Sequence, residues 1–164
     1  MRCRKKNTSS SVKEEINWKN KLEEIRLKKT GDKLEENMSN MKEGRDGLIS
    51  IIVPMYHAAE YIEETIACVE KQTYTDWELI LVDDCGPDES LPVAARCREN
   101  SANREKIRIV RNERNLGAAE TRNHGVAEAR GRYIAYLDAD DLWLPTKLEE
   151  ELLFLRQKEA AFVF

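Results

Sequence analysis

Four short apolar runs alternate with helix-length segments, and this alternation constrains the fold more than any other feature of the sequence. Continuous apolar runs are typical of strands covered on both faces, as in a parallel sheet. Strands alternating with helices indicate βαβ units. The expected strands are residues 48–53, 77–82, 106–110 and 132–137, and the expected helices are residues 58–72, 88–100, 117–129 and 145–158. The sequence therefore predicts an α/β domain, a mostly parallel sheet flanked by helices.

Charge is distributed unevenly along the 164 residues. Residues 1–46 carry 13 Lys/Arg and 9 Asp/Glu, a net charge of +4, whereas residues 47–164 have a net charge of −8. The composition changes at the same point, from a Lys-, Glu- and Asn-rich segment to the first apolar run. We therefore predict a charged N-terminal extension at 1–46 and one domain at 47–164. The acidity of that domain argues against a nucleic-acid partner.

The extension carries one thin apolar stripe, formed by Trp18, Leu22 and Ile25 and interrupted at Gly31. We interpret it as a solvated, partly helical segment, with a short coiled coil or a basic membrane-surface helix as alternatives. The four cysteines lack metal-ligand spacing, and no run approaches the ~20 apolar residues of a membrane span. The expectation is a cytoplasmic chain, with peripheral contact at the inner face of the membrane as an option.

Polar and charged residues gather where the predicted strands end. In open α/β sheets, ligands bind outside the carboxyl ends of the strands. In this sequence those ends are the segments "PMYH", "DDCGPDE", "RNERNLG" and "DADDLW". The four loops therefore predict a single ligand site along one edge of the sheet.

The last of these loops places Asp138, Asp140 and Asp141 at the tip of an apolar strand. In an extended chain Asp138 and Asp140 point to the same side about 6.6 Å apart, and they repel by about 2.5 kcal/mol at an effective dielectric near 20. A divalent cation turns this repulsion into attraction, and it commonly completes its shell with substrate phosphates. The motif therefore points to a metal-bridged diphosphate site. The alternative is a solvated loop that caps the next helix.

The loop after the second strand begins with Asp83 and Asp84. One of these carboxylates can accept hydrogen bonds from the base or ribose of a nucleotide. The alternative is turn chemistry, because Gly86 and Pro87 make a turn and Asp88 can cap the next helix. We expect Asp84 to be functional and Asp88 to be structural.

The two remaining loops supply further candidate contacts. Tyr56, which follows the strand-ending Pro54, can stack on a planar base. Arg114 or Arg122 can contact a phosphate near the start of the third helix. The alternative for Tyr56 is an ordinary aromatic residue in a loop, and the alternative for each arginine is a solvated side chain. We expect His124, on the same helix, to be a surface residue and not a base.

Together, the stretches "SIIVPMYHAAEYIEETIACVEKQTYTDWELILVDDCGPDES" and "NLGAAETRNHGVAEARGRYIAYLDADDLWLPTKLE" resemble the family 2 glycosyltransferases. The order and spacing of several motifs carry this resemblance, which extends from Leu48 to Phe164. It implies the GT-A fold, a Rossmann-like sheet that binds a nucleotide sugar. One loop departs from the family pattern, because Cys85-Gly86-Pro87 replaces the usual Gly-Ser-Thr.

The resemblance implies roles at the base end of the site. Pro54 and Tyr56 match the loop that packs on the nucleotide. Asp84, with Asp83 beside it, matches the acid that reads the base, typically uracil. A second departure lies in this region, because His57 stands where the family often has Asn.

The resemblance also implies roles at the diphosphate end. Arg122 lies in an A-R-N-type segment near the donor, although Thr121 precedes it here in place of Ala. Asp138 and Asp140 match the D-x-D motif, with Asp140 as the expected metal ligand and Asp141 next to it. The implied ion is Mg²⁺ or Mn²⁺, which stabilises charge on the departing nucleoside diphosphate.

The implied reaction is an inverting transfer of a sugar from a nucleoside diphosphate sugar, typically a UDP-sugar, to a glycan or other hydroxyl acceptor in polysaccharide biosynthesis. The family's general base lies in the second half of its domain and is expected beyond Phe164. Residues 160–164 are expected to begin a fifth strand, so the chain is expected to be incomplete. Two alternatives remain: a non-catalytic nucleotide-binding fragment, and an interaction protein whose extension docks a partner.

Overall fold

The computed structural model describes residues 47–158, 161 and 163. The predicted extension at 1–46 lies outside the described residues, so its three interpretations and its boundary stay predictions. The fifth strand predicted at 160–164 also falls mostly outside them. Of that segment only Ala161 and Val163 are described, and neither belongs to a strand.

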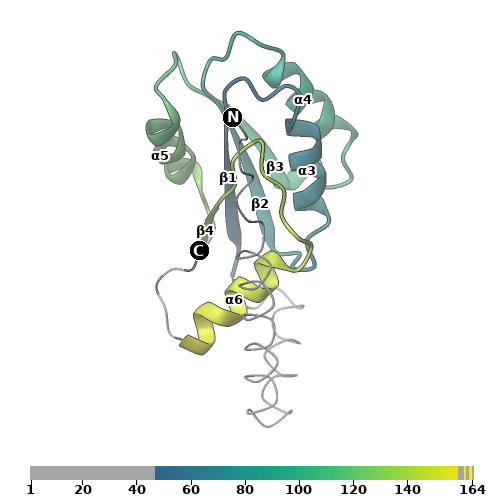
Figure 1. Ribbon diagram of the computed structural model, residues 1–164, viewed down its shortest axis with the longest axis vertical. Helices are drawn as coiled ribbons and strands as arrows, with labels where there is room; N and C mark the ends of the chain where they lie inside the picture. The colour runs from purple at the N-terminus through teal and green to yellow at the C-terminus, as the bar shows by residue number, and fades with distance from the viewer. Residues whose placement is uncertain (1–46, 159–160, 162, 164) are drawn as a thin grey trace, which may run out of the picture. The chain divides into compact units, whose positions relative to one another are not determined.

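The described residues form one parallel sheet with helices on its faces (Figure 1). Its order is β3-β2-β1-β4. The strands are β1 (Ile49–Met55), β2 (Trp77–Asp83), β3 (Ile107–Arg111) and β4 (Tyr133–Tyr136). The helices are α3 (Ile62–Glu70), α4 (Ser90–Asn100), the 3-10 turn η1 (Arg104–Lys106), α5 (Ala118–Glu128) and α6 (Lys147–Lys158). The predicted α/β fold is confirmed.

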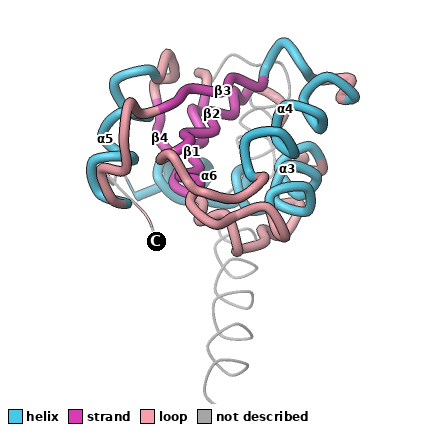
Figure 2. The backbone as a smooth tube through the Cα atoms, turned by 90° about the horizontal axis from the view of Figure 1, so that it is seen from above, coloured by secondary structure: helices cyan, strands magenta, loops and turns pink. Residues whose placement is uncertain are grey.

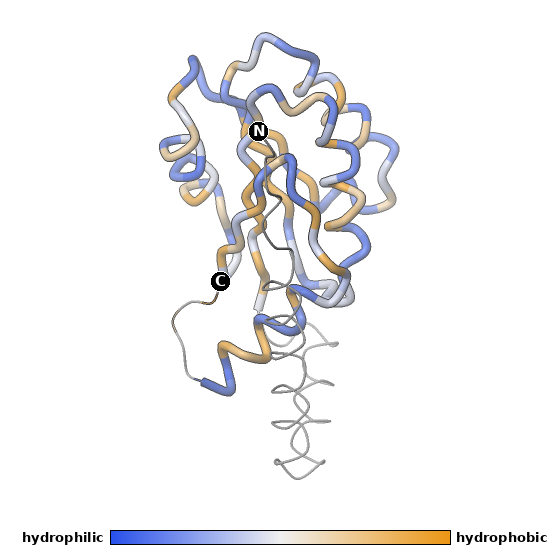
Figure 3. The backbone as a smooth tube through the Cα atoms, in the orientation of Figure 1, coloured by the Kyte–Doolittle hydropathy of each residue, from blue (hydrophilic) through white to orange (hydrophobic). Residues whose placement is uncertain are grey.

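The side chains of the central strands alternate between two apolar clusters, one on each face of the sheet. Ile51 and Val53 of β1 face the larger cluster, which includes residues of α3, α4 and α6. Ile52 faces the smaller cluster on the side covered by α5 (Figure 2). This alternation follows from the period of two in a strand. Figure 3 shows the resulting concentration of hydrophobic residues along the strands.

The fourth strand is less buried than its apolar sequence predicts. Among the described residues β4 pairs with β1 alone, so it forms an edge of the sheet. Ile134 and Tyr136 are 39% and 53% exposed. The expectation of a buried strand is therefore wrong for β4 in the described part, although it holds for β1 and β2. Within residues 47–158, none of the helices combines the length and the apolar composition needed to cross a membrane.

Gly125 allows α5 to pack directly on the sheet. A Cβ added at this position would lie 2.4 Å from Ile52 Cγ2 and 3.2 Å from Val82 Cγ2. Both neighbours are buried and branched at Cβ, so neither can swing away easily. The glycine that weakens this helix in the sequence is therefore required by its packing.

Gly125→Ala should lower the free energy of unfolding by about 1–2 kcal/mol, because overpacking outweighs the gain in helix propensity. Urea denaturation measures the change. The exposed Ala127→Gly is the control, with an expected loss of about 1 kcal/mol from propensity alone. A Gly125→Ala variant more stable than the wild type would contradict the close packing of α5.

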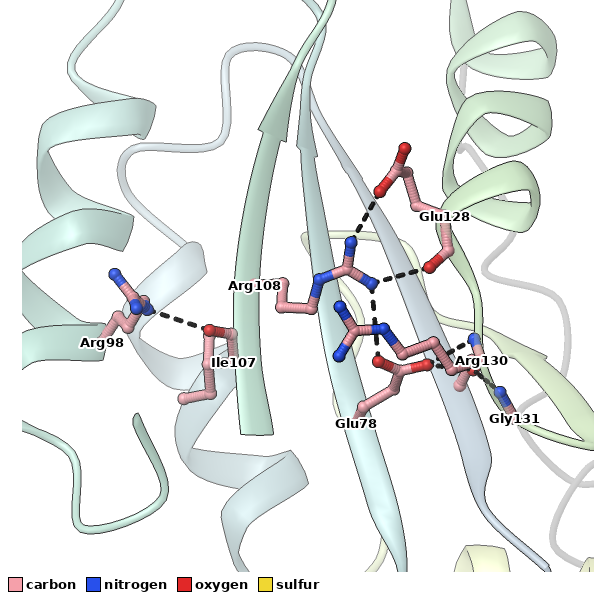
Figure 4. Close-up of polar contacts among 8 residues, drawn as sticks. Glu78, Arg98, Ile107, Arg108, Glu128, Arg130 and Gly131 are labelled. Atoms are coloured by element: carbon pink, nitrogen blue, oxygen red, sulfur yellow. Dashed lines mark hydrogen bonds and ion pairs between the residues drawn. The ribbon is translucent and has the colours of Figure 1, made fainter. Parts of the chain in front are cut away.

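A buried ionic network ties the amino ends of the strands to the end of α5 (Figure 4). Glu78 of β2 is 6% exposed, and its Oε1 accepts hydrogen bonds from the Ser50 hydroxyl and the Arg130 N–H, both at 2.7 Å. Arg108 of β3 lies 3.6 Å from Glu78 Oε2 and donates to the Glu128 carbonyl at 2.7 Å. The guanidinium thus satisfies a carbonyl at the C-terminus of α5 while it balances the buried carboxylate.

Candidate functional site

An open pocket of about 430 Å³ lies at the carboxyl end of the sheet. Loops that follow all four strands contribute to it. Because β2 and β4 lie on opposite sides of β1, the strand order reverses at β1, which is where open α/β sheets bind ligands. The residues that line it are Pro54, Met55, Tyr56, His57, Ala58, Tyr61, Asp84, Asn115, Gly117, Ala118, Thr121, Arg122, Asp138, Ala139 and Asp140.

The fold therefore brings most of the predicted site residues to one pocket. Its wall includes Pro54, Tyr56, Asp84, Arg122, Asp138 and Asp140. Pro54 lies inside β1, which continues to Met55 although the proline was expected to end the strand. The others come from the segments after β1, β2 and β4 and from α5. Asp83 and Asp141 are not part of the wall. Arg114 is exposed and also lies outside it, which leaves Arg122 as the pocket's arginine.

Tyr56, His57 and Tyr61 form the aromatic side of the pocket. The Tyr56 and His57 rings meet edge to face with their centroids 4.6 Å apart, and half of the Tyr56 surface is exposed. His57 has φ of 54°, a left-handed conformation that both His and Asn adopt more readily than most residues. His57 can therefore take the place of an Asn without a change of loop conformation. Sequence reasoning missed Tyr61, because no spacing marks it as a pocket residue.

Asp84 is buried, and its carboxylate is held by the loop before α5. Oδ1 accepts hydrogen bonds from Asn112 Nδ2 at 2.7 Å and from the Leu116 N–H at 2.8 Å, and Oδ2 accepts one from the Gly117 N–H at 2.9 Å. Burial works to raise the pKa of Asp84, but these bonds, together with the polar side chain of Thr121, lower it below its ordinary value. Asp84 is thus ionised and oriented before any ligand binds.

Asp83 has different surroundings although it is the adjacent residue. Its side chain is 3% exposed, and Oδ2 pairs with Arg111 Nε at 3.0 Å. Burial raises the pKa of Asp83 and outweighs the Arg111 charge, which works to lower it. The two acids point to opposite faces of the strand end, as neighbours in an extended segment do. Only Asp84 therefore reaches the pocket.

The acidic segment after β4 is a turn and not an extended strand. β4 ends at Tyr136, and the Asp141 N–H donates to the Asp138 carbonyl at 3.0 Å. The extended backbone expected for Asp138 to Asp140 is therefore wrong, and the spacing of about 6.6 Å that depended on it does not apply. The turn still places both residues on the pocket wall, and it carries Asp141 away from it.

Arg122 of α5 forms an ion pair with Asp138 Oδ1 across the pocket. The two side chains are 33% and 49% exposed, so solvent reaches the pair and weakens it. A guanidinium and two carboxylates, Asp138 and Asp140, thus share one end of the pocket. This end can bind both a cation and a phosphate.

The carboxylates of the pocket fit a cation that binds together with a phosphate-containing ligand. Among the described residues, no group of three or more His, Cys, Asp or Glu side chains is arranged to hold a metal ion. Mg²⁺ and its analogues are commonly held by one or two carboxylates, with water and substrate phosphates as the remaining ligands. Asp138 and Asp140 match this pattern, and they match a preformed metal centre poorly.

An open parallel sheet with an acid-rimmed pocket at its β1/β4 switch point is typical of ligand-binding α/β domains. A family model described as "Glycosyl transferase family 2" matches residues 50–164. The chain therefore belongs to glycosyl transferase family 2, as the resemblance of its motifs predicts.

Two curated relatives illustrate the match. The putative teichuronic acid biosynthesis glycosyltransferase TuaG of Bacillus subtilis is 41% identical over 117 residues, which is 71% of this chain and 45% of TuaG. The Escherichia coli UDP-Glc:alpha-D-GlcNAc-diphosphoundecaprenol beta-1,3-glucosyltransferase WfgD is 37% identical over 119 residues, which is 73% of this chain and 45% of WfgD. This chain thus spans about half the length of the curated relatives that it matches.

Solved structures confirm the predicted GT-A fold. The mannosyltransferase PcManGT from Pyrobaculum calidifontis, in complex with GDP-Man and Mn²⁺, matches with a TM-score of 0.62 at 26% identity, over 65% of this chain and 32% of that one. S. aureus TarS, in complex with UDP, matches with a TM-score of 0.60 at 26% identity, over 68% of this chain and 32% of that one.

Proposed function

We propose that this chain is the donor-binding part of a glycosyltransferase that moves a sugar from a UDP-sugar to a hydroxyl of a glycan acceptor. One observation carries the proposal: a single pocket combines the aromatic Tyr56, the oriented carboxylate of Asp84 and the pair Asp138 and Asp140. These groups suit the base, the ribose and the diphosphate of a nucleotide. The UDP and UDP-GlcNAc complexes of TarS support this choice of donor.

Tyr56, Pro54 and Asp84 bind the base in this proposal. The exposed Tyr56 ring offers a stacking surface, and Pro54 also lines the pocket. The Asp84 carboxylate has roughly four lone-pair sites, and three are occupied by the chain's own donors. The remaining site accepts one hydrogen bond, which suits the single imide N–H of uracil.

Asp138, Asp140 and Arg122 bind the diphosphate. Asp140 is the proposed principal ligand of Mn²⁺ or Mg²⁺, with Asp138 beside it. The cation supplies Lewis-acid stabilisation of the negative charge on the departing nucleoside diphosphate. Arg122 neutralises Asp138 before the donor binds and donates hydrogen bonds to a phosphate oxygen afterwards. The PcManGT complex with GDP-Man and Mn²⁺ supports a cation at such a site.

In the proposed reaction the acceptor oxygen attacks the anomeric carbon and loses its proton to a general base. The acceptor oxygen attacks from the side opposite the phosphate, and the bond from that carbon to the phosphate oxygen breaks in the same displacement. The sugar configuration therefore inverts. None of the described pocket residues is assigned as this general base, because the acids of the pocket bind the nucleobase and the diphosphate. The name of WfgD specifies a lipid-linked acceptor. It supports the proposal that this chain acts on a glycan acceptor, in the cytoplasm and in peripheral contact with the inner face of the membrane.

Calorimetric titration of the full chain with UDP, with Mn²⁺ or with EDTA, tests the proposal. We expect binding at least about tenfold tighter with Mn²⁺, because the cation links the carboxylates to the diphosphate. If the folded chain binds neither UDP nor GDP, with Mn²⁺ or with EDTA, the result would contradict the donor site. It would then favour the interpretation as an interaction protein. Unfolding followed by circular dichroism is the control for folding.

The second candidate is a nucleotide-binding fragment without transferase activity. It is favoured by one observation: the three acids on the wall of the described pocket, Asp84, Asp138 and Asp140, are all assigned to the nucleobase, the diphosphate and the cation. Both candidates predict UDP binding, so binding does not separate them. Release of UDP from a UDP-sugar in the presence of glycan acceptors separates them, because only the enzyme accelerates it.

A further inference from the structure

We propose that Thr121, Asn112 and His124 are positioning residues for Asp84 and thereby set the affinity of the pocket for the nucleobase. This inference rests on the proposed function and deepens it. Neither Asn112 nor His124 lines the pocket, and Thr121 departs from the Ala of the A-R-N-type segment. The three residues act through the carboxylate that is proposed to read the base.

The chain of hydrogen bonds begins on α5. His124 Nδ1 lies 2.6 Å from Asn112 Oδ1. Because an amide oxygen can only accept, the bond requires a hydrogen on Nδ1. The contact determines which end of the Asn112 amide faces His124, and it turns the Nδ2 group towards Asp84.

Asn112 links His124 to the Asp84 carboxylate. Its Nδ2 donates to Asp84 Oδ1 at 2.7 Å and to Thr121 Oγ1 at 2.9 Å, and so uses both of its hydrogens. The Thr121 side chain also works to lower the pKa of Asp84. Asn112 and Asp84 are 4% and 2% exposed, and Thr121 is fully buried. Water cannot replace a lost partner there without a rearrangement, so each bond strongly constrains the carboxylate.

Asp84 in turn holds the loop that leads into α5. Its two oxygens accept the N–H groups of Leu116 and Gly117, and Gly117 has φ of 83°, which few residues other than glycine adopt. Gly117 and Asn115 line the pocket. The buried network therefore determines the position of the base-reading acid and of the loop beside it.

Thr121→Val tests this role, because valine keeps the shape of the side chain and removes the hydroxyl. Thr121→Ser is the matched variant that restores the hydroxyl and lacks the methyl group. We expect Thr121→Val to bind UDP with Mn²⁺ about tenfold more weakly than the wild type, and Thr121→Ser to recover most of that loss. Calorimetry on the full chain measures affinity, and thermal unfolding establishes that each variant is folded.

His124→Phe provides a second variant that leaves the buried threonine intact. It keeps an aromatic ring on α5 and removes the Nδ1 hydrogen that orients Asn112. We expect UDP affinity to fall about fivefold in a folded protein, since one neutral hydrogen bond is lost outside the pocket. A merely structural role for His124 would lower the unfolding temperature and leave the affinity of the folded protein unchanged.

The outcomes separate this inference from the proposed function. If the wild type binds neither UDP nor GDP, the proposed donor site is wrong and the positioning role falls with it. If the wild type binds UDP and the folded Thr121→Val and His124→Phe variants bind it equally well, the donor site stands and the positioning role is wrong. If Thr121→Ser loses as much affinity as Thr121→Val, the methyl group matters and the hydroxyl does not.

Discussion

Asp140→Asn is expected to weaken UDP binding in Mn²⁺ on the order of 100-fold, and to leave it nearly independent of the metal. Asparagine keeps the size of the side chain and removes the negative charge that attracts the cation. Asp140 lies on the pocket wall, and its neighbour Asp138 is already paired with Arg122. Without Asp140, the remaining carboxylate is shared between a guanidinium and the cation.

Calorimetric titration with UDP, in Mn²⁺ and in EDTA, measures this effect. Glu113→Gln is the charge-matched control, because Glu113 is exposed in the loop before α5 and lies outside the pocket. Asp141→Asn tests the third acid that the sequence predicts as a ligand, and its position outside the pocket wall leads us to expect a loss of less than about fivefold. Equal losses in Asp140→Asn and Glu113→Gln would mean that net charge, and not a metal ligand, governs binding.

Glu78→Ala is expected to lower the free energy of unfolding by about 3 kcal/mol, since it removes a buried acceptor that several polar groups share. The substitution deprives the Ser50 hydroxyl and the Arg130 N–H of their acceptor. It also removes one of the two carboxylates beside Arg108, which is 25% exposed and retains Glu128. The loss includes a cavity term from the deleted side chain.

Urea denaturation of the two proteins gives the difference in unfolding free energy. Glu105→Ala is the matched control: Glu105 pairs with Arg104 on the surface with its side chain 87% exposed, so the expected change is within about 0.5 kcal/mol. A loss in Glu78→Ala as small as that in the control would mean that the network contributes no stability beyond surface pairs.

Much of the fold could be predicted because it depends on local patterns. Ile51, Ile52 and Leu79 belong to continuous apolar runs, and such runs occur in strands covered on both faces. The alternation of those runs with helices leaves few topologies other than a parallel sheet. The clustering of acids after the second and fourth runs then predicts the edge at which a ligand binds.

The geometry of the acids could not be predicted in the same way. Asp83 and Asp84 are adjacent and chemically identical in the sequence, but Asp83 pairs with Arg111 and Asp84 lines the pocket. Asp138 and Asp141 close a turn, which the periodicity of the preceding strand does not indicate. In the sequence Gly125 only weakens the predicted helix, and its close packing against Ile52 is visible only in the structure.

The sequence by itself determined the α/β architecture, the carboxyl-edge location of the site and the family, because each follows from the order and spacing of residues near one another in the chain. Only the tertiary structure decided which acids share the pocket and which residues orient them. Asp84, Asn112 and Thr121 lie on three different segments, and their hydrogen bonds exist only once the sheet and α5 are packed together. Burial then gives these bonds their strength, since no water competes for the same donors.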